Sequence, residues 1–508
     1  MTLHSNPLLA DRRVRLALAA AAGAALCAAF APSNLWLLAL LSPALLMSLW
    51  QGASPRHAAA LGFWFNVGTF AAGTYWLYIS IHTVGQAPAW IAFIAMIGLV
   101  CILALYGAAL GWLVARWLPA TGALRWMAAL PAAWLLEEWF RGWFLTGFPW
   151  LSLGYSQTGT WMAGVAPILG VYGVSALLLI GAGALVTLGL GTRRERLLAG
   201  MVLVAIWVVP WSVRGIPWTS PAGPAISVAI VQGAIPEDEK LQAAQLDNQL
   251  ETYRDLTQGV LGAQVIVWPE AAVPDTAQHS ADYLLARYHE AHAHHSALVV
   301  GIFRENKAGD LYNSLVSLGD DSVDWYDKQH LVPFTEAIPG PAFAREWLEF
   351  MHLPFEGFEY GASNQEPVAA GALMLLPAIC YDDAYGSSNL HMLRTANALV
   401  TVTNDGWFGH STARYQHLQI AQMRSIETGR YLVRAANDGI SAIIGPDGRV
   451  LAQAPGFVQA ILRGSVVPMR GLPPYARFGN WLIISLSATT LAVILAWGFA
   501  RGRRNLGS

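Results

Sequence analysis

Charged side chains are scarce in this chain of 508 residues. Asp, Glu, Lys and Arg make up only 12% of the sequence, while 55% of it is hydrophobic. A soluble protein of average composition carries about twice that charged fraction, so the composition indicates a membrane protein. The formal net charge at pH 7 is only −2, which gives no reason to expect binding to nucleic acid.

Cysteine is also rare, with three residues in the whole chain, Cys27, Cys101 and Cys380. The first two lie in hydrophobic segments, so a disulfide framework is not expected. Cys380 directly follows the hydrophobic run Leu373–Ile379. A single cysteine in apolar surroundings is most often a core residue, so its position alone leaves a structural and a chemical interpretation open.

Long hydrophobic runs occupy the first 215 residues and the last 35 or so. A membrane-spanning helix needs about 20 apolar residues. Because more hydrophobic segments follow the first run without a pause, we expect that run to be a retained helix, not a cleaved signal peptide. The sequence predicts eight spans, at about residues 14–31, 34–52, 58–82, 88–116, 122–140, 160–190, 197–214 and 477–500.

Basic residues cluster at every second turn between these predicted spans, on the side of the N-terminus. The turns APSN and HTVGQAPA carry no Lys or Arg. Because positive residues favour the cytoplasmic side, we expect both termini in the cytoplasm and residues 220–470 outside, which in a Gram-negative cell means the periplasm. The clusters contain Arg12, Arg13, Arg15, Arg56, Arg116, Arg125, Arg193, Arg194, Arg196, Arg501, Arg503 and Arg504.

The stretch EEWFRGWFLTGFPWLSLGY, from Glu137 to Tyr155, combines aromatic and charged residues beside a predicted span. Aromatic residues at a helix end usually form an interfacial belt. Charges near hydrocarbon are energetically expensive and are therefore less ordinary. We predict that this stretch helps to shape a lipid-facing cavity, in which Arg141 is a candidate to contact a phosphate.

Residues 220–470 have a different pattern, in which short β-rich runs alternate with helical stretches. This alternation predicts an α/β domain, and about 250 residues are enough to bury a core. Three domains are therefore expected: 1–219 with seven spans, 220–470, and 471–508 with the last span. The predicted strands are SVAIVQG, AQVIVWPE, ALVVGIF, YNSLVSLG, SVDWYDK, LMLLPAIC and ALVTVTND, and the predicted helices are 239–260, 280–295, 388–396 and 413–435.

Three of the predicted strands lead directly to side chains that suit thiol-based acyl transfer. Glu270 ends AQVIVWPE, Lys328 ends VDWYDK and Cys380 ends LMLLPAIC. A thiol needs a base to become nucleophilic, and Glu270 is the candidate. Lys328 and the backbone N–H of Tyr381 are candidates to stabilise an oxyanion, and Glu336 to orient the lysine or an incoming amine. Spacing alone leaves both a structural and a catalytic interpretation open.

The histidine-rich stretch HEAHAHH, from His289 to His295, is the one segment that suggests a metal. Its positions on a predicted helix form no known ligand spacing with other Cys or His residues. We therefore predict a solvated helix face, and no metal or cofactor is expected.

The order of the motifs WPE, YDKQHLVPFTE, ICYDDAY, NDGWFG and R-x-x-E-x-x-R with RAANDGIS resembles the carbon–nitrogen hydrolase (nitrilase) superfamily. The preceding helices and EEWFRGW…GFPWLSLGY resemble its membrane branch, the bacterial apolipoprotein N-acyltransferases. The resemblance covers nearly the whole chain. It implies an αββα sandwich, a triad of Glu270, Lys328 and Cys380, and a second essential glutamate at Glu336. The other matched positions are Tyr381 after the nucleophile and Asn404, Trp407 and Phe408 beside the site.

The chain departs from that family pattern at two places. Asp382 stands where the family commonly has a glutamate, one methylene longer. The family often carries a tryptophan near Lys240, where the next residue here is Leu241. These differences leave the role of Asp382 and the contacts of the substrate loop undecided.

The resemblance also implies a two-step reaction that completes lipoprotein maturation. Cys380 attacks an acyl ester of a membrane phospholipid, typically phosphatidylethanolamine, and a thioester and a lysophospholipid result. The α-amino group of the N-terminal diacylglyceryl-cysteine of an apolipoprotein then attacks the thioester. Ping-pong kinetics are expected for such a covalent mechanism.

Three other classes of function remain as alternatives. A membrane-tethered amidase would use water in the second step. A non-catalytic scaffold would carry a decayed site, although all three triad positions are intact. A transporter would be expected to carry more charged residues within its spans.

Overall fold

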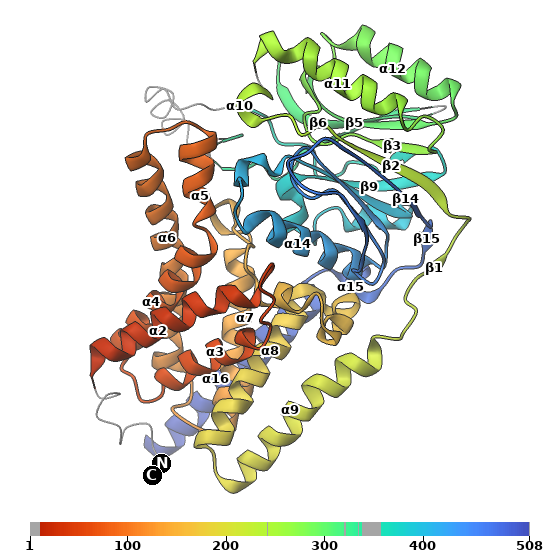
Figure 1. Cartoon of the computed structure of the whole chain (residues 1–508). Helices are drawn as coiled ribbons and strands as arrows, with labels where there is room; N and C mark the ends of the chain where they lie inside the picture. The colour runs from red at the N-terminus through yellow and green to blue at the C-terminus, as the bar shows by residue number, and fades with distance from the viewer. Residues whose placement is uncertain (1–10, 241, 320–321, 334, 338–356, 507–508) are drawn as a thin grey trace. The chain divides into compact units, whose positions relative to one another are not determined.

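The computed structural model of the chain describes residues 11–240, 242–319, 322–333, 335–337 and 357–506 (Figure 1). Leu241 therefore lies outside the described residues. The chain divides into two compact units. The helical unit comprises residues 1–78, 87–216 and 478–508, and the sheet unit comprises residues 79–86 and 217–477.

The helical unit is built from apolar helices that pack through glycine. A Cβ atom at Gly62 of α4 would lie 2.0 Å from the carbonyl oxygen of Gly107 on α6. Such close backbone approach is typical of helix pairs in membranes. The main helices are α2 (Arg12–Leu26), α3 (Leu38–Leu49), α4 (Pro55–Gly73), α5 (Trp76–Tyr78), α6 (Ala89–Trp117), α7 (Leu130–Arg141), α8 (Ala166–Leu190), α9 (Arg193–Val213) and α16 (Trp481–Leu506).

Among the described residues, four helices are long and apolar enough to cross a membrane: 89–117, 161–190, 193–213 and 481–498. The other predicted spans correspond to α2, α3, α4 and α7. Of these, α2 and α3 have only 15 and 12 residues, shorter than the usual spanning length of about 20. The 12 residues of α7 continue directly from a π-helical turn of 5 residues, Arg125–Ala129. The number of eight spans therefore stays a prediction.

The predicted span 58–82 is not one continuous helix. It ends at Gly73 because Thr74 leaves the helical conformation, with φ −123° and ψ 18°. The chain resumes in the short α5 and then in a π-helical turn, Ile79–Val84, which belongs to the sheet unit. The hydrophobic run was long enough for one span, but hydropathy carries no information about where a backbone bends.

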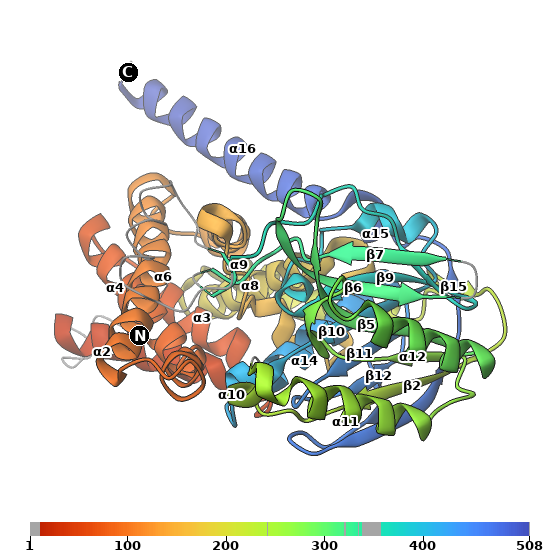
Figure 2. The ribbon, with the colours of Figure 1, turned by 90° about the horizontal axis from the view of Figure 1, so that it is seen from above.

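The sheet unit contains two large sheets with helices on their outer faces, which confirms the predicted αββα sandwich, and a small two-stranded sheet of β1 and β15. One sheet has the strand order β13-β12-β11-β10-β9-β8, and the other has β14-β2-β3-β5-β6-β7, with β4 paired to β5. Buried aliphatic residues of both sheets form one core cluster between them. Helices α11 (Leu246–Gln258) and α12 (Ala281–Ala293) cover one sheet and α14 (Ala413–Thr428) the other (Figures 1 and 2).

All seven predicted strands are present, and they are joined by further strands that the hydrophobic pattern did not reveal. The seven are β2 (Ile226–Gln232), β3 (Val265–Val267), β5 (Ala297–Glu305), β6 (Leu311–Leu318), β7 (Val323–Asp327), β9 (Leu373–Ile379) and β10 (Ala398–Thr403). The others are β1 (Ser220–Pro221), β4 (Val273–Thr276), β8 (Val368–Ala370), β11 (Leu432–Ala436), β12 (Ala442–Ile444), β13 (Val450–Gln453), β14 (Ala460–Val466) and β15 (Met469–Arg470).

The predicted helix 413–435 is too long, because its last part is strand. Helix α14 ends at Thr428, where Gly429 adopts the left-handed conformation with φ 62°. A glycine in that conformation commonly ends a helix. Strand β11 then begins at Leu432. Its burial on both faces hides the alternation that marks a strand with one exposed face.

Candidate active site

Cys380 lies at a strained turn between strand β9 and a 3₁₀ helix, Cys380–Ala384. Its φ of +48° is in the left-handed region, which costs a residue with a side chain about 1–3 kcal/mol. Such strain persists only where the surrounding structure enforces it, and it is common at functional sites. In other hydrolase folds a sharp strand-to-helix turn of this kind presents the nucleophile.

Lys328 directly follows β7 and lies between two carboxylates. Its Nζ is 2.8 Å from Glu336 Oε1 and 3.2 Å from Glu270 Oε1. All three side chains are buried. The structure therefore brings together two of the predicted strand-end residues, Glu270 and Lys328, with the further candidate Glu336. A buried charge needs partners, and the two carboxylates provide them for the ammonium.

The charges in this cluster determine the resting state of the thiol. Burial raises the pKa of Cys380, Glu270 raises it further, and Lys328 only partly opposes them. For Lys328 itself, burial lowers the pKa, but Glu270, Glu336 and Cys380 outweigh that effect, so its pKa is well above the usual value. The resting pair is therefore a neutral thiol and an ammonium, and the thiol needs a base in order to react.

Two residues that the sequence reasoning missed complete the surroundings of Glu270. Asn313, on β6, donates from Nδ2 to Glu270 Oε1 at 2.8 Å and to Glu336 Oε1 at 2.9 Å. Lys240 donates from its buried Nζ to the backbone carbonyl of Glu270 at 2.9 Å. A polar Asn inside the apolar run YNSLVSLG was the signal that could have pointed to the first of these.

Asp382 joins the nucleophile turn to the strand that carries the lysine. Its carboxylate accepts hydrogen bonds from Tyr326 Oη at 3.0 Å, from Ile379 N at 3.2 Å and from His330 N at 2.8 Å. His330 Nδ1 lies 3.1 Å from the same carboxylate. The shorter side chain therefore serves to fix the position of Cys380 relative to Lys328, a role that the sequence left undecided.

Of the predicted residues near the triad, Asn404 contacts Glu270 directly, whereas the contacts of Trp407, Phe408 and Tyr381 are with other residues. Asn404 donates from its backbone N–H to Glu270 Oε2 at 2.9 Å and from Nδ2 to Glu237 Oε2 at 2.5 Å. The carbonyl of Trp407 accepts from Ser80 Oγ at 2.6 Å. The ring of Phe408 meets His417 edge-on at 5.9 Å, and Tyr381 meets Tyr385 in the same manner at 5.2 Å.

Arg141 belongs to the helical unit, where it is buried. Its guanidinium donates to the carbonyl of Trp150 at 2.9 Å and also to that of Phe148, and it lies over the ring of Phe70 at 5.3 Å. These contacts hold the segment that follows α7. Contact between Arg141 and a phosphate stays a prediction.

Comparison with known proteins covers both units. A family described as "Apolipoprotein N-acyltransferase N-terminal domain" matches residues 22–184, and one described as "Carbon-nitrogen hydrolase" matches residues 227–467. A Pseudomonas putida protein named apolipoprotein N-acyltransferase is 39% identical over 496 residues, covering 96% of both chains. An Azotobacter vinelandii protein of the same name is 41% identical and covers 96% of this chain and 95% of its own length. The chain belongs to the apolipoprotein N-acyltransferase family.

The chain also has a weak similarity to solved structures. A carbon–nitrogen hydrolase from Helicobacter pylori G27 is 16% identical, with a TM-score of 0.35, and the match covers 55% of this chain and 95% of that one. The enzyme class rests on the full-length relatives: an N-acyltransferase within the carbon–nitrogen hydrolase superfamily.

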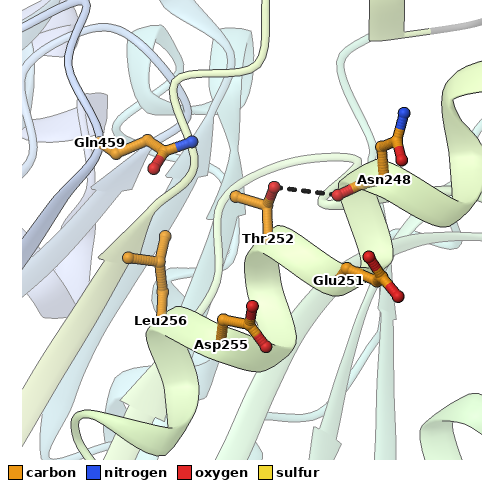
Figure 3. A pocket seen from close by; sticks show the side chains of 6 residues that line it. All are labelled: Asn248, Glu251, Thr252, Asp255, Leu256 and Gln459. Atoms are coloured by element: carbon orange, nitrogen blue, oxygen red, sulfur yellow. Dashed lines mark hydrogen bonds between the residues drawn. The ribbon is translucent and has the colours of Figure 1, made fainter.

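One surface hollow lies elsewhere in this member of the apolipoprotein N-acyltransferase family. It has a volume of about 450 Å³ and contains none of the predicted site residues. Figure 3 shows that α11 contributes most of its lining, with Thr252 donating to the carbonyl of Asn248 at 2.9 Å. The lining residues are Asn248, Glu251, Thr252, Asp255, Leu256 and Gln459.

Within the part of the chain that the structure describes, no group of three or more His, Cys, Asp or Glu side chains is arranged to hold a metal ion. In the predicted His289–His295 stretch, the ring of His292 stacks on Tyr288 at 5.5 Å.

The buried carboxyl group of Asp438 has a raised pKa, from which we expect the stability of the fold to depend on pH. Burial, followed by the nearby Glu237, raises its pKa from 3.8 to about 7; Lys240 lowers it and Asp405 raises it further. Between these two pKa values the folded chain binds the proton more tightly than the unfolded chain. The free energy of unfolding should therefore fall as the pH rises from about 4 to about 7.

Asp438→Asn should remove this part of the pH dependence. We expect its melting temperature to exceed that of the wild type increasingly as the pH rises from about 5 to about 8, in a series of thermal unfolding curves. Asp447→Asn, at a largely exposed position, is the matched control and should run parallel to the wild type. Parallel curves for Asp438→Asn as well would contradict the prediction.

Proposed function

We propose that this protein transfers a fatty acyl chain from a phospholipid to the α-amino group of the N-terminal diacylglyceryl-cysteine of apolipoproteins, through a thioester on Cys380. One observation carries the proposal: in a member of this family, a strained cysteine lies within the electrostatic reach of a buried lysine and a buried glutamate. A nucleophile, a base and a cation are the parts that acyl transfer requires.

In the first step Cys380 Sγ attacks the ester carbonyl of the phospholipid, while Glu270 takes the thiol proton. A base must act in this step because burial keeps the thiol neutral at rest. Lys328 and the backbone N–H of Tyr381 stabilise the oxyanion. The ester C–O bond then breaks, Glu270 returns the proton to the leaving oxygen, and a lysophospholipid departs.

In the second step the acceptor amine attacks the thioester carbonyl. Glu270 takes a proton from the nitrogen, the C–N bond forms, the C–S bond breaks, and the thiolate recovers a proton. Glu336 orients Lys328, supported by their 2.8 Å contact. Asn404, Trp407, Phe408 and Arg141 are the proposed substrate-binding residues.

The membrane setting of the proposal rests on the sequence and on four helices of spanning length. We propose eight spans in the inner membrane, seven in residues 1–219 and one in 471–508, with both termini cytoplasmic. The catalytic domain, 220–470, is then periplasmic, on the side where lipoprotein precursors are anchored. Phosphatidylethanolamine is the proposed acyl donor, and an apolipoprotein is the proposed acceptor.

The fate of a labelled acyl chain tests this proposal. Purified protein is mixed with phosphatidylethanolamine carrying a labelled acyl chain and with a lipopeptide that begins with diacylglyceryl-cysteine. We expect the label to appear as an amide on the lipopeptide, measured by mass spectrometry. A lipopeptide with an acetylated N-terminus is the matched control and should receive no label, since its nitrogen is no longer nucleophilic.

Other outcomes separate the alternatives. Release of the label as free fatty acid at the same rate with and without the lipopeptide would indicate an amidase-like hydrolase. Unchanged phospholipid would indicate a scaffold or a transporter. A preference for phosphatidylglycerol over phosphatidylethanolamine would contradict only the proposed donor.

A further inference from the structure

A buried charged network that the mechanism above does not use contacts the main chain of the nucleophile. His417, on α14, places Nε2 3.1 Å from the carbonyl oxygen of Cys380 and Nδ1 2.8 Å from Asp405 Oδ1. Arg434, on β11, lies 2.9 Å from Asp405 Oδ2 and 3.3 Å from Asp383 Oδ2. None of the four ionisable side chains is more than 3% exposed.

Strong restraints hold the His417 ring in this orientation. Burial raises the pKa of Asp405, but Arg434 and His417 lower it more, so it stays well below the usual range and the side chain is an anion. Thr403 Oγ1 donates to Asp405 at 3.0 Å, and Phe408 packs edge-on against the imidazole. A buried ionic network is weak evidence for added stability. A role in orienting His417 is therefore the better explanation of this network.

The hydrogen bond between His417 and Cys380 has one possible direction. A backbone carbonyl can only accept, so His417 Nε2 carries the hydrogen and donates it. The peptide bond between Cys380 and Tyr381 is trans, since the only cis bond among the described residues joins Ala31 and Pro32. In a planar trans peptide the N–H points opposite to the C=O, so the N–H of Tyr381 points away from His417.

We propose that His417 is a positioning residue for acyl transfer: through the carbonyl of Cys380 it fixes the peptide plane that follows the nucleophile and aims the N–H of Tyr381 at the oxyanion. The inference rests on the proposed function, because it requires a tetrahedral intermediate on Cys380. The hydrogen bond also polarises the peptide and makes its N–H a stronger donor. It further helps to hold Cys380 in its left-handed conformation.

The experiment compares two reactions of the same thiol. Formation of the acyl-enzyme from labelled phospholipid passes through an oxyanion, whereas alkylation of Cys380 by iodoacetamide does not. His417→Leu removes the donor. His417→Gln keeps an amide N–H near the position of Nε2. Both rates are measured for each full-length variant, after thermal unfolding has shown that it is folded.

We expect His417→Leu to slow acyl-enzyme formation by at least about 10-fold, somewhat less than the 10²–10³-fold effect of deleting an oxyanion donor outright. Alkylation should keep the wild-type rate, and His417→Gln should restore most of the acylation rate. An equal fall in both rates would overturn the proposal, since His417 would then only support the thiol. Wild-type acylation in His417→Leu would overturn it as well.

Two further comparisons keep the outcome decisive. If His417→Leu does not fold, His417→Gln is compared with His417→Asn, whose amide is too short to reach the carbonyl. Only the Asn variant should then lose acylation, and equal rates would overturn the proposal. If the wild type itself forms no acyl-enzyme, the proposed function fails, whereas normal acylation in the variants removes only the role of His417.

Discussion

Replacing Cys380 with serine is expected to abolish the acyl-enzyme and to lower acyl transfer by about 10³-fold or more, as removal of a nucleophile does in other covalent enzymes. The physical reason is the difference in acidity between a thiol and an alcohol. Glu270 can take a proton from the buried thiol, whose pKa is already raised by burial and by Glu270 itself, but an alcohol holds its proton far more tightly. The measurement is mass spectrometry of the Cys380 peptide after incubation with labelled phospholipid.

The other two cysteines of the chain provide matched controls. Cys27→Ser and Cys101→Ser make the same replacement of sulfur by oxygen at two cysteines of the helical unit. Both substitutions should leave the adduct and the transfer rate unchanged. In the wild type the adduct should be released by neutral hydroxylamine, as a thioester is. A labelled adduct that persists in Cys380→Ser would show that the nucleophile is elsewhere.

Replacing Glu270 with glutamine is expected to slow acylation by about 10²–10⁴-fold, the range that general acid–base catalysis contributes. Glutamine has nearly the same shape but only one acceptor oxygen. It can therefore keep the hydrogen bond from Asn313 or the one from the N–H of Asn404, which reach different oxygens of Glu270 at 2.8 and 2.9 Å, but not both. It cannot take a proton from Cys380. The burst of labelled acyl-enzyme in a rapid-mixing experiment should therefore disappear.

Glu336→Gln is the control that separates proton transfer from charge balance. Both glutamates contact Lys328 and both accept from Asn313. Either substitution therefore removes one negatively charged neighbour of the Lys328 ammonium. Glu270 raises the pKa of Cys380 and is the proposed base. We expect a smaller loss of acylation in Glu336→Gln. Equal losses would mean that the charge around Lys328 matters and that Glu270 is not the base.

Local patterns in the sequence mark the three candidate residues of the triad. Glu270, Lys328 and Cys380 each follow a short hydrophobic run, and such runs became the strands β3, β7 and β9. Parallel β9 and β10 end at the same edge of one sheet, which is where open α/β structures place their sites. The order of the motifs then indicated the superfamily, and the full-length relatives confirmed the family.

The residues that support the site were harder to predict because their partners are distant in the sequence. Asn313 reaches Glu270 and Glu336 only because β6 pairs with β7, which places the carbonyl of Asn313 2.9 Å from the N–H of Lys328. His417 meets Cys380 because α14 packs on the sheet that ends at the nucleophile. A polar residue in an apolar strand or helix indicates that its side chain has a hydrogen-bond partner. The local sequence does not show which group that partner is.

The sequence by itself determined the membrane character, the two kinds of domain, the αββα class and the residues at the three strand ends. These follow from composition, from periodicity and from short motifs, which are properties of neighbouring residues. Only the tertiary structure decided that a helix breaks at Thr74, that Asp382 joins the nucleophile turn to the loop after β7, and that His417 donates to the carbonyl of Cys380. Each of these depends on strand register and on the packing of helices against sheets, which bring together groups that no local pattern connects.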